Sequence, residues 1–360
     1  MNTTQSDNTQ PRRTRLIGLT LPGLRDLVAS LGMPAFSAGQ IARWLYQKRA
    51  TSIDMMTDLS VKNRQKLAEV VEVGLRAPVA EARSADGTVK YLFSGVGGRD
   101  VEAVYIPDGD RATLCVSSQA GCRMGCRFCM TGQGGFQGNL TVADIMNQIL
   151  AIPESEKLTN IVFMGMGEPL DNLDAVMGAI EILTAKWGFA WSPKRITVST
   201  VGANPGALEH LLELTRVHVA LSLHNPFTAA RAAIMPAERA NPATAVLDLL
   251  RRHDWSGQRR LSVEYIMWRG VNDDLRHAEA VARLLRGLDA RVNLIRFHRI
   301  PGFEGAPSSK AVMEAFRDHL NDRGITATIR ASRGEDISAA CGMLAGRARE
   351  QQFRHLNNDN

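Results

Sequence analysis

Five cysteines carry the most distinctive chemistry in this chain of 360 residues. Cys122, Cys126 and Cys129 are separated by three and then two residues, Cys115 lies just before them, and Cys341 lies near the end of the chain. Thiolates are soft ligands that suit zinc or an iron–sulfur cluster. An odd number of cysteines, four of them crowded into fifteen positions, does not suit a disulfide framework. The sequence therefore predicts a metal or redox centre.

The number of available ligands distinguishes a structural zinc site from an iron–sulfur cluster. A structural zinc site normally uses four ligands, and apart from Cys115 the nearest candidates, His224 and His298, would have to come from far along the chain. Three thiolates leave one iron of a [4Fe-4S] cluster open, and that iron can bind the amino and carboxylate groups of S-adenosylmethionine (SAM). Electron transfer then cleaves the sulfonium to a 5′-deoxyadenosyl radical. The spacing is typical of radical SAM enzymes, with structural zinc as the alternative.

The elements that position these thiols alternate between strand and helix from residue 111 onward. Strands are expected near residues 112–118, 159–166, 195–200, 217–223, 261–268 and 291–297, with helices near 141–151, 172–186, 205–214, 242–253, 276–287 and 309–323. Alternation of this kind predicts parallel strands with crossover helices. We expect an α/β fold, a partial (βα)6 TIM-like barrel open on one side, although a doubly wound sheet would give the same pattern.

Polar residues follow several of the predicted strands, where a β/α barrel gathers its active site. In the segment Gly165-Met-Gly-Glu-Pro169, glycines let the backbone approach a ligand, and Glu168 can accept a hydrogen bond from an ammonium group. Ser199 and the segment Ser222-Leu-His224 are placed to hold a ribose or a carboxylate. The candidate SAM-binding residues are Gly167, Glu168, Ser199, Ser222, Leu223, His224 and His298.

The N-terminal part has a different pattern. Apolar residues recur at helical spacing from Leu24, a second helix is expected to begin at Ser37 with a Ser37–Gln40 capping box, and a third lies near 62–73. Short strands and turn signals predict a β-hairpin linker. We therefore divide the chain into a helical accessory domain (1–80), whose basic residues beside Trp44 and Tyr46 suit contact with RNA, a hairpin linker (81–110), a barrel with a C-terminal loop that carries Cys341 (111–346) and a polar tail (347–360).

Composition limits the classes of function. No apolar run is long enough for a membrane span or a signal peptide, which favours a cytoplasmic protein without a membrane partner. The formal charge is +6, and residues 1–100 hold fourteen Lys and Arg against nine Asp and Glu. This imbalance favours a polyanionic partner, although an ordinary basic surface explains the charge equally well.

Several segments in collinear order resemble the RlmN/Cfr family of radical SAM RNA methyltransferases. They are Cys115-Val-Ser-Ser-Gln-Ala-Gly-Cys122, Gly165-Met-Gly-Glu-Pro-Leu170, Ser222-Leu-His224, Val292-Asn-Leu-Ile295 and Arg333-Gly-Glu-Asp336 through Ala340-Cys-Gly342. The resemblance runs from about Leu16 to Gly346. It implies a radical SAM barrel with a [4Fe-4S] cluster on the three clustered cysteines and two SAM molecules per turnover. The RlmN branch methylates carbon 2 of an adenosine in 23S rRNA (the 2503 site) and in some tRNAs, whereas the Cfr branch methylates carbon 8.

The resemblance also implies roles for residues outside the cluster. Cys341 would become S-methylcysteine, Cys115 would resolve the RNA adduct through a transient disulfide with Cys341, and Glu102 would be the general base. Many RlmN members carry an Asn-containing segment where this chain has Arg296-Phe-His-Arg-Ile-Pro301, so His298 would stand in for that Asn near SAM, and Asn293 is an alternative ligand. We expect a monomer that takes electrons from a flavodoxin-type reductant.

Three other functions remain open at this point. A Cfr-type carbon-8 methyltransferase would use the same cysteines, and the N-terminal region, which resembles RlmN more than Cfr, favours carbon 2. A non-catalytic zinc and RNA-binding protein would not need Cys341. A radical enzyme acting on a peptide or a small metabolite would cleave SAM without depending on RNA.

Overall fold

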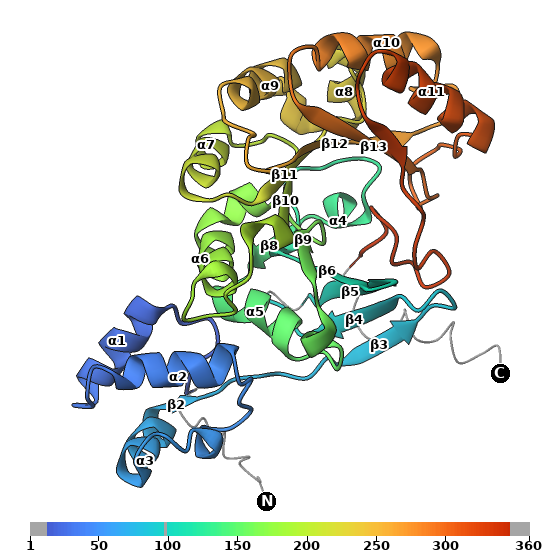
Figure 1. Cartoon of the computed structure of the whole chain (residues 1–360). Helices are drawn as coiled ribbons and strands as arrows, with labels where there is room; N and C mark the ends of the chain where they lie inside the picture. The colour runs from blue at the N-terminus through green and yellow to red at the C-terminus, as the bar shows by residue number, and fades with distance from the viewer. Residues whose placement is uncertain (1–12, 97–98, 346–360) are drawn as a thin grey trace, which may run out of the picture.

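The computed structural model describes residues 13–96 and 99–345, so the predicted polar tail over 347–360 lies outside the described residues. One curved sheet of ten strands runs through the molecule in the order β14-β13-β12-β11-β10-β9-β6-β5-β4-β3 (Figure 1). Its strands are β3 (Ala80–Arg83), β4 (Val89–Phe93), β5 (Val101–Asp108), β6 (Arg111–Cys115), β9 (Asn160–Phe163), β10 (Ile196–Thr200), β11 (His218–Ser222), β12 (Leu261–Met267), β13 (Ala290–Arg296) and β14 (Ala327–Ile329).

The predicted α/β architecture is confirmed. Strands β6 and β9 to β14 are parallel, and the six predicted strands are all present, with β14 added at one edge. The crossover helices cover the convex side of the sheet in Figure 1. They are α5 (Val142–Leu150), α6 (Leu173–Thr184), α7 (Pro205–Leu214), α9 (Ala243–Arg251), α10 (Leu275–Leu284) and α11 (Lys310–Asp322). Because β3 and β14 stand at opposite ends of the strand order, the described sheet is an open, partial barrel.

The segment predicted as a hairpin linker forms part of this sheet. Strands β3, β4 and β5 are antiparallel to one another, and β5 pairs with β6 over Val104↔Cys115 to Asp108↔Arg111. All five residues of β4, which lies between β3 and β5, are buried. This segment is therefore part of the packed sheet and not an exposed connection. The division of the chain into domains stays a prediction, but the hairpin strands and the barrel share one sheet.

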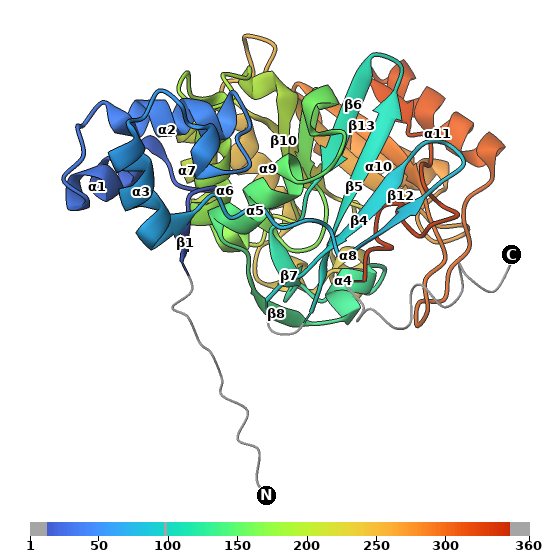
Figure 2. The same ribbon diagram turned by 90° about the horizontal axis from the view of Figure 1, so that it is seen from below.

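The three predicted N-terminal helices are present as α1 (Leu21–Ser30), α2 (Ser37–Tyr46) and α3 (Val61–Val70), beside the short parallel pair β1 (Thr14–Arg15) and β2 (Val71–Glu72). The predicted capping box is wrong: the N-cap is Phe36, the Ser37 hydroxyl has no hydrogen-bond partner among the described residues, and Gln40 donates to the carbonyl of Asp58. The end of α2 packs against the segment that follows α6, where the Tyr46 ring lies 5.9 Å from the Trp187 ring between centroids. Figures 1 and 2 both show this helical region at one end of the molecule.

The remaining elements are short. They are the antiparallel pair β7 (Gln119–Gly121) and β8 (Phe136–Asn139), the helices α4 (Met130–Gln133) and α8 (Thr228–Ile234), and the 3-10 turns η1 (Ile53–Met55), η2 (Ser155–Lys157), η3 (Pro169–Asn172), η4 (Pro193–Arg195) and η5 (Pro236–Arg239). No helix in the described parts of the chain is long and apolar enough to cross a membrane.

Candidate active site

The three clustered cysteines lie on the loop that joins β7 to α4. The Cys122 amide donates to the carbonyl of Gly135 at 3.0 Å, and helix α4 begins directly after Cys129. Gly121 permits this path, because its φ is +74° and a Cβ there would lie 1.9 Å from the oxygen of Gly135. A single local turn therefore sets the positions of all three thiols.

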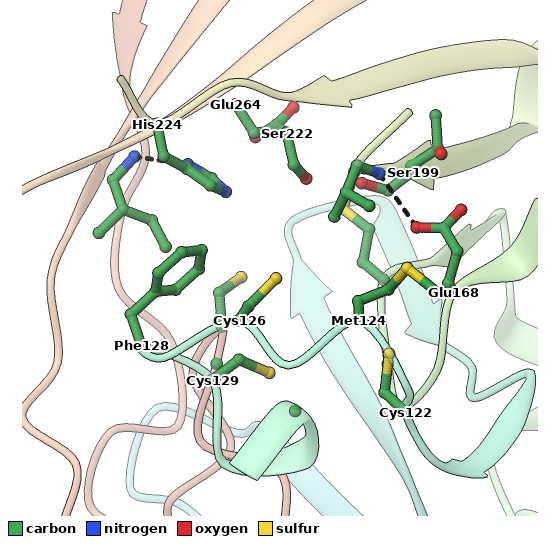
Figure 3. A pocket seen from close by; sticks show the side chains of 18 of the residues that line it. Cys122, Met124, Cys126, Phe128, Cys129, Glu168, Ser199, Ser222, His224 and Glu264 are labelled. Carbon is green, nitrogen blue, oxygen red and sulfur yellow. Dashed lines mark hydrogen bonds between the residues drawn. The ribbon is translucent and has the colours of Figure 1, made fainter. Parts of the chain in front are cut away.

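These thiols line a pocket at the C-terminal ends of the parallel strands, where the sequence placed the site. Figure 3 shows the cysteines on one side of this pocket and Ser199, Ser222 and His224 on the other. Five of the seven candidate SAM-binding residues line it, namely Gly167, Glu168, Ser199, Ser222 and His224. The fold has thus brought together side chains from the ends of three strands and the cysteine loop.

The donor set fits an iron–sulfur cluster. Burial raises the pKa of each thiol, to about 12 for Cys122, so the ionised form needs a positive ion beside it. A structural zinc ion normally takes four ligands, whereas this loop supplies three thiols. Cys122, Cys126 and Cys129 are the residues that would hold a cluster, and the pocket beside them is where SAM would bind its open iron.

Glu168 is fixed between two strands. It is 2% exposed, and its carboxylate accepts hydrogen bonds from the amides of Leu170 at 3.2 Å and Val201 at 3.0 Å. Burial raises its pKa to about 7 despite these bonds. The neighbouring Gly167 has a φ of +100°, and a Cβ there would lie 2.6 Å from Gln119. A side chain at this position would therefore collide with Gln119 on β7. Glycine is thus required here by packing, in addition to the close approach to a ligand that the sequence predicted.

His224 has a defined tautomer. Its Nδ1 accepts a hydrogen bond from the amide of Ile266 at 3.1 Å, which leaves the proton on Nε2. Burial, together with the charge of Arg231, lowers its pKa to about 3, so the ring is neutral at physiological pH. The ring packs edge-on against Phe128 on the cysteine loop, with 4.9 Å between centroids. His224 therefore offers a neutral donor to a ligand.

Two candidate SAM ligands lie elsewhere. Leu223 is fully buried in the core, and its carbonyl accepts from Arg231. His298 is buried outside the pocket, with Nε2 3.3 Å from the hydroxyl of Ser332 and Nδ1 3.3 Å from a carboxylate oxygen of Glu335. That second pair is close enough for an ion pair but lacks hydrogen-bond geometry, since the described residues provide no hydrogen-bond partner for Nδ1. Contact of His298 with SAM stays a prediction.

Glu264 is a pocket residue that the sequence analysis missed. It lies on β12 and lines the pocket, with Oε1 accepting from Ser262 at 2.9 Å and from Asn293 at 2.8 Å. Its Oε2 is buried, has no hydrogen-bond partner among the described residues, and lies 3.8 Å from Nη1 of Arg330. Asn293, the alternative SAM ligand, does not line the pocket itself but donates a hydrogen bond to Glu264, which does. A charged residue inside a mostly apolar strand was the available signal.

The two remaining cysteines meet in a second cavity. Cys115, at the end of β6, and Cys341 both line it, and Cys341 also lines the first pocket. Burial raises the pKa of Cys115 to about 12, the proximity of Cys341 adds to this rise, and the charge of Arg330 opposes it. Met130 donates to the carbonyl of Gly342 at 2.9 Å, which ties the Cys341 segment to α4. Cys341 and the cluster cysteine Cys129 thus line both cavities.

Comparisons with known proteins agree with this geometry. The Radical SAM superfamily model matches residues 116–283, and a model described as the ribosomal RNA large subunit methyltransferase N-terminal domain matches residues 14–73. The probable dual-specificity RNA methyltransferase RlmN of Bacteroides fragilis is 57% identical over 340 residues, which cover 94% of this chain and 98% of that protein. The chain belongs to the RlmN family of radical SAM methyltransferases.

More distant relatives of this family retain the similarity. The dual-specificity RNA methyltransferase RlmN of Halorhodospira halophila is 44% identical over 340 residues, covering 93% of this chain and 94% of that protein. A crystal structure of a radical SAM methyltransferase from Sphaerobacter thermophilus superimposes with a TM-score of 0.86 and 40% identity, covering 93% of this chain and all of that one. Family membership implies a [4Fe-4S] cluster and SAM, and the pocket beside the three cysteines suits both.

Glu102, the predicted general base of this RlmN-family chain, lies on β5 and is fully buried. Its Oε2 accepts from the amide of Ala345 at 2.9 Å, and its Oε1 lies 3.4 Å from Nζ of Lys90. Glu102 lines neither cavity. In this conformation it anchors the segment that follows Cys341, and its role as a base stays a prediction.

Proposed function

We propose that this chain methylates carbon 2 of an adenosine in RNA, at the 2503 site of 23S rRNA and in tRNA. Its RlmN relatives are named as dual-specificity RNA methyltransferases, and the match to the ribosomal RNA methyltransferase N-terminal model favours this branch over carbon-8 methylation. The observation that carries the proposal is the position of Cys341, which lines both the pocket of the three cluster cysteines and the cavity that it shares with Cys115 and Cys129.

Cys341 is proposed as the methyl carrier. Carbon 2 of adenine is electron-poor, so it does not attack the sulfonium methyl of SAM directly, and a covalent intermediate divides the step. The Cys341 sulfur takes the methyl of one SAM, which forms a sulfur–carbon bond and leaves S-adenosylhomocysteine. When bound, the cluster and a second SAM supply the radical that removes a hydrogen atom from this methyl group. Cys341 is exposed, which supports access by the bulky donor.

Cys115 and Glu102 are proposed to release the product. Once the methylene carbon is bonded to carbon 2, the RNA is attached to the sulfur of Cys341. Radical addition leaves one unpaired electron on the ring, which the cluster, when bound, would take back. Glu102 takes the proton from carbon 2, and the Cys115 thiolate attacks the Cys341 sulfur, so that a sulfur–sulfur bond forms and the sulfur–carbon bond breaks. The electron pair of the broken bond passes to the methylene carbon, which gains a proton and becomes the methyl group. An external reductant then reduces the disulfide, and a flavodoxin-type protein supplies electrons to the cluster. The shared cavity of Cys115 and Cys341 supports this pairing.

Isotope labelling tests the proposal. Anaerobically reconstituted enzyme is incubated with methyl-labelled SAM, dithionite and an rRNA fragment, and mass spectrometry follows both Cys341 and the adenosine. We expect label on Cys341 first and then in 2-methyladenosine. Appearance of 8-methyladenosine would assign the chain to carbon-8 chemistry, and SAM cleavage with neither product would refute RNA as the substrate.

A further inference from the structure

A second concave site lies at the opposite ends of the strands. The loops that precede β10, β11 and β12 enclose a cavity of about 410 Å³. Three cationic side chains line it, Lys194, Arg216 and Arg259, together with Ser192 and Ser256. Strand β10 has five residues at about 3.3 Å each, so this cavity and the cysteine pocket are on the order of 15 Å apart. The cavity is therefore separate from the site of methyl transfer.

Arg259 is the most unusual of these cations. It is 5% exposed, and it donates from Nε to the carbonyl of Val217 and from Nη1 to the carbonyl of Leu212, each at 3.1 Å. Its buried Nη2 has no acceptor among the described residues. Burial and the nearby Arg216 lower its pKa to about 10, so it still carries its charge at neutral pH. A buried charged donor without an acceptor is costly unless a ligand supplies one.

The charges around the cavity are mostly positive. Asp254 is the carboxylate that lines it, and both of its oxygens accept hydrogen bonds from Ser256 at 2.8 Å. His218, at the start of β11, has its pKa lowered to about 4, first by burial and then by Arg260, Arg259, Lys194 and Arg111. Arg260 and Arg111, which do not line the cavity, therefore add to the positive field of Lys194 and Arg259. The single lining carboxylate, Asp254, does not neutralise this field.

We propose that this cavity binds a phosphate group. Guanidinium, ammonium and hydroxyl donors from three loops converge there, and together they suit the several acceptor oxygens of a phosphate. The phosphate belongs either to the backbone of an RNA or to a free phosphate-bearing molecule, since both present the same chemistry. The RNA source rests on the proposed function of the chain, whereas phosphate binding itself does not.

Pyrophosphate is the probe for the first experiment. Calorimetric titration of the reconstituted enzyme is compared between the wild type and a Lys194→Gln/Arg216→Gln variant, in which two exposed side chains change. Loss of these charge-assisted hydrogen bonds is expected to weaken pyrophosphate binding about tenfold or more. The matched control is Arg283→Gln/Arg317→Gln, which removes two positive charges from the outer helices α10 and α11. It is expected to bind pyrophosphate like the wild type.

His218 provides a local readout for the same titration. Bound pyrophosphate opposes the positive field, so the pKa of His218, followed by NMR of its ring, is expected to rise in the wild type and in the control variant. Equal pyrophosphate binding by Lys194→Gln/Arg216→Gln and wild type, or binding that leaves the His218 titration unchanged, overturns the proposal. Neither readout requires methyl transfer, so failure of the proposed function leaves this test intact.

RNA binding distinguishes the two sources of phosphate. If the cavity holds the RNA backbone, Lys194→Gln/Arg216→Gln lowers RNA affinity and reduces the dependence of log affinity on log salt by about two units of slope, while the control variant does not. If the variant loses pyrophosphate binding but keeps wild-type RNA affinity, the phosphate site stands and its occupant is a free phosphate-bearing molecule.

Discussion

The two groups of cysteines in this molecule reach their positions by different means. Cys122, Cys126 and Cys129 share one short loop between β7 and α4, so the local path of the chain places all three. Cys115 and Cys341 come from the first parallel strand and from a C-terminal segment, and they meet because that segment crosses the barrel. The first arrangement follows from spacing, whereas the second depends on the whole fold.

The β3–β4 hairpin holds the C-terminal segment in place through hydrogen bonds. The hydroxyl of Ser84 donates to Asp336 at 2.6 Å, and the amide of Gly334 donates to Asp86 at 3.0 Å. Lys90 reaches the carbonyl of Ser338 at 3.4 Å. The antiparallel strands thus hold the segment that carries Cys341, which remains the exposed member of the five cysteines. We infer that the cluster cysteines need rigidity and Cys341 needs access.

Removal of a cysteine from each group gives the largest expected contrast. Cys126→Ala is expected to lose the cluster, and with it iron content, visible absorbance and SAM cleavage, because two thiolates remain for a centre that needs three. Cys341→Ala is expected to retain all three properties while losing methyl transfer. Iron analysis and SAM-cleavage assays on the two purified variants make the comparison. Loss of iron from Cys341→Ala would contradict the separation of the two groups.

Cys115→Ala tests the pair across the second cavity. Without the attacking thiolate, the RNA is expected to stay bonded to Cys341, so turnover stops at a covalent complex. Denaturing electrophoresis with labelled RNA detects this complex, and Cys341→Ala serves as the control that cannot form it. Normal multiple turnover by Cys115→Ala would remove Cys115 from the mechanism.

Glu102→Gln asks whether the hairpin contributes chemistry as well as support. An amide can still accept from Ala345, so the C-terminal segment should remain docked while proton removal is lost. A general base is worth roughly 10²–10⁴-fold, and turnover is expected to fall by about that amount. Lys90→Met, which removes the partner charge but leaves the carboxylate, is the matched control. Equal small losses of turnover in both variants would indicate a purely structural role for Glu102.

The same contrast explains what could be predicted from the sequence. Alternating strands and helices gave the parallel sheet and its helices, because periodicity is set locally, and Glu168, Ser199 and His224 were found because parallel strands end at one edge. Glu264 was missed because it lies inside a strand, whereas the residues expected at the site follow strands, and its hydrogen bond to Asn293 of the next strand is visible only in the fold. The hairpin was taken for a linker because its local pattern does not reveal that β5 pairs with β6 and joins the large sheet.

Glu168→Gln tests how much the charge of one pocket residue contributes to SAM affinity, a smaller effect than those above. Burial raises the pKa of Glu168 to about 7, so the carboxyl is neutral below this pH and ionised above it. Because SAM carries an ammonium group, its affinity for the reconstituted enzyme is expected to rise as pH increases through about 7. Glu168→Gln cannot ionise, so it should bind SAM about tenfold more weakly above pH 7 and lack this rise. Equilibrium dialysis at about pH 6 and about pH 8 measures both effects.

The stability of the ligand-free protein gives an independent check on Glu168. Its pKa in the folded chain exceeds the usual value of 4.5 for a glutamate, so the unfolded state releases this proton first. The free energy of unfolding should therefore fall as pH rises from about 4.5 to about 7, and the carboxyl adds no further pH dependence above that window. Urea unfolding of Glu168→Gln should lack this part of the fall. If both proteins lost stability in parallel, the carboxyl would be ionised throughout, and the pH dependence of SAM binding would belong to another group.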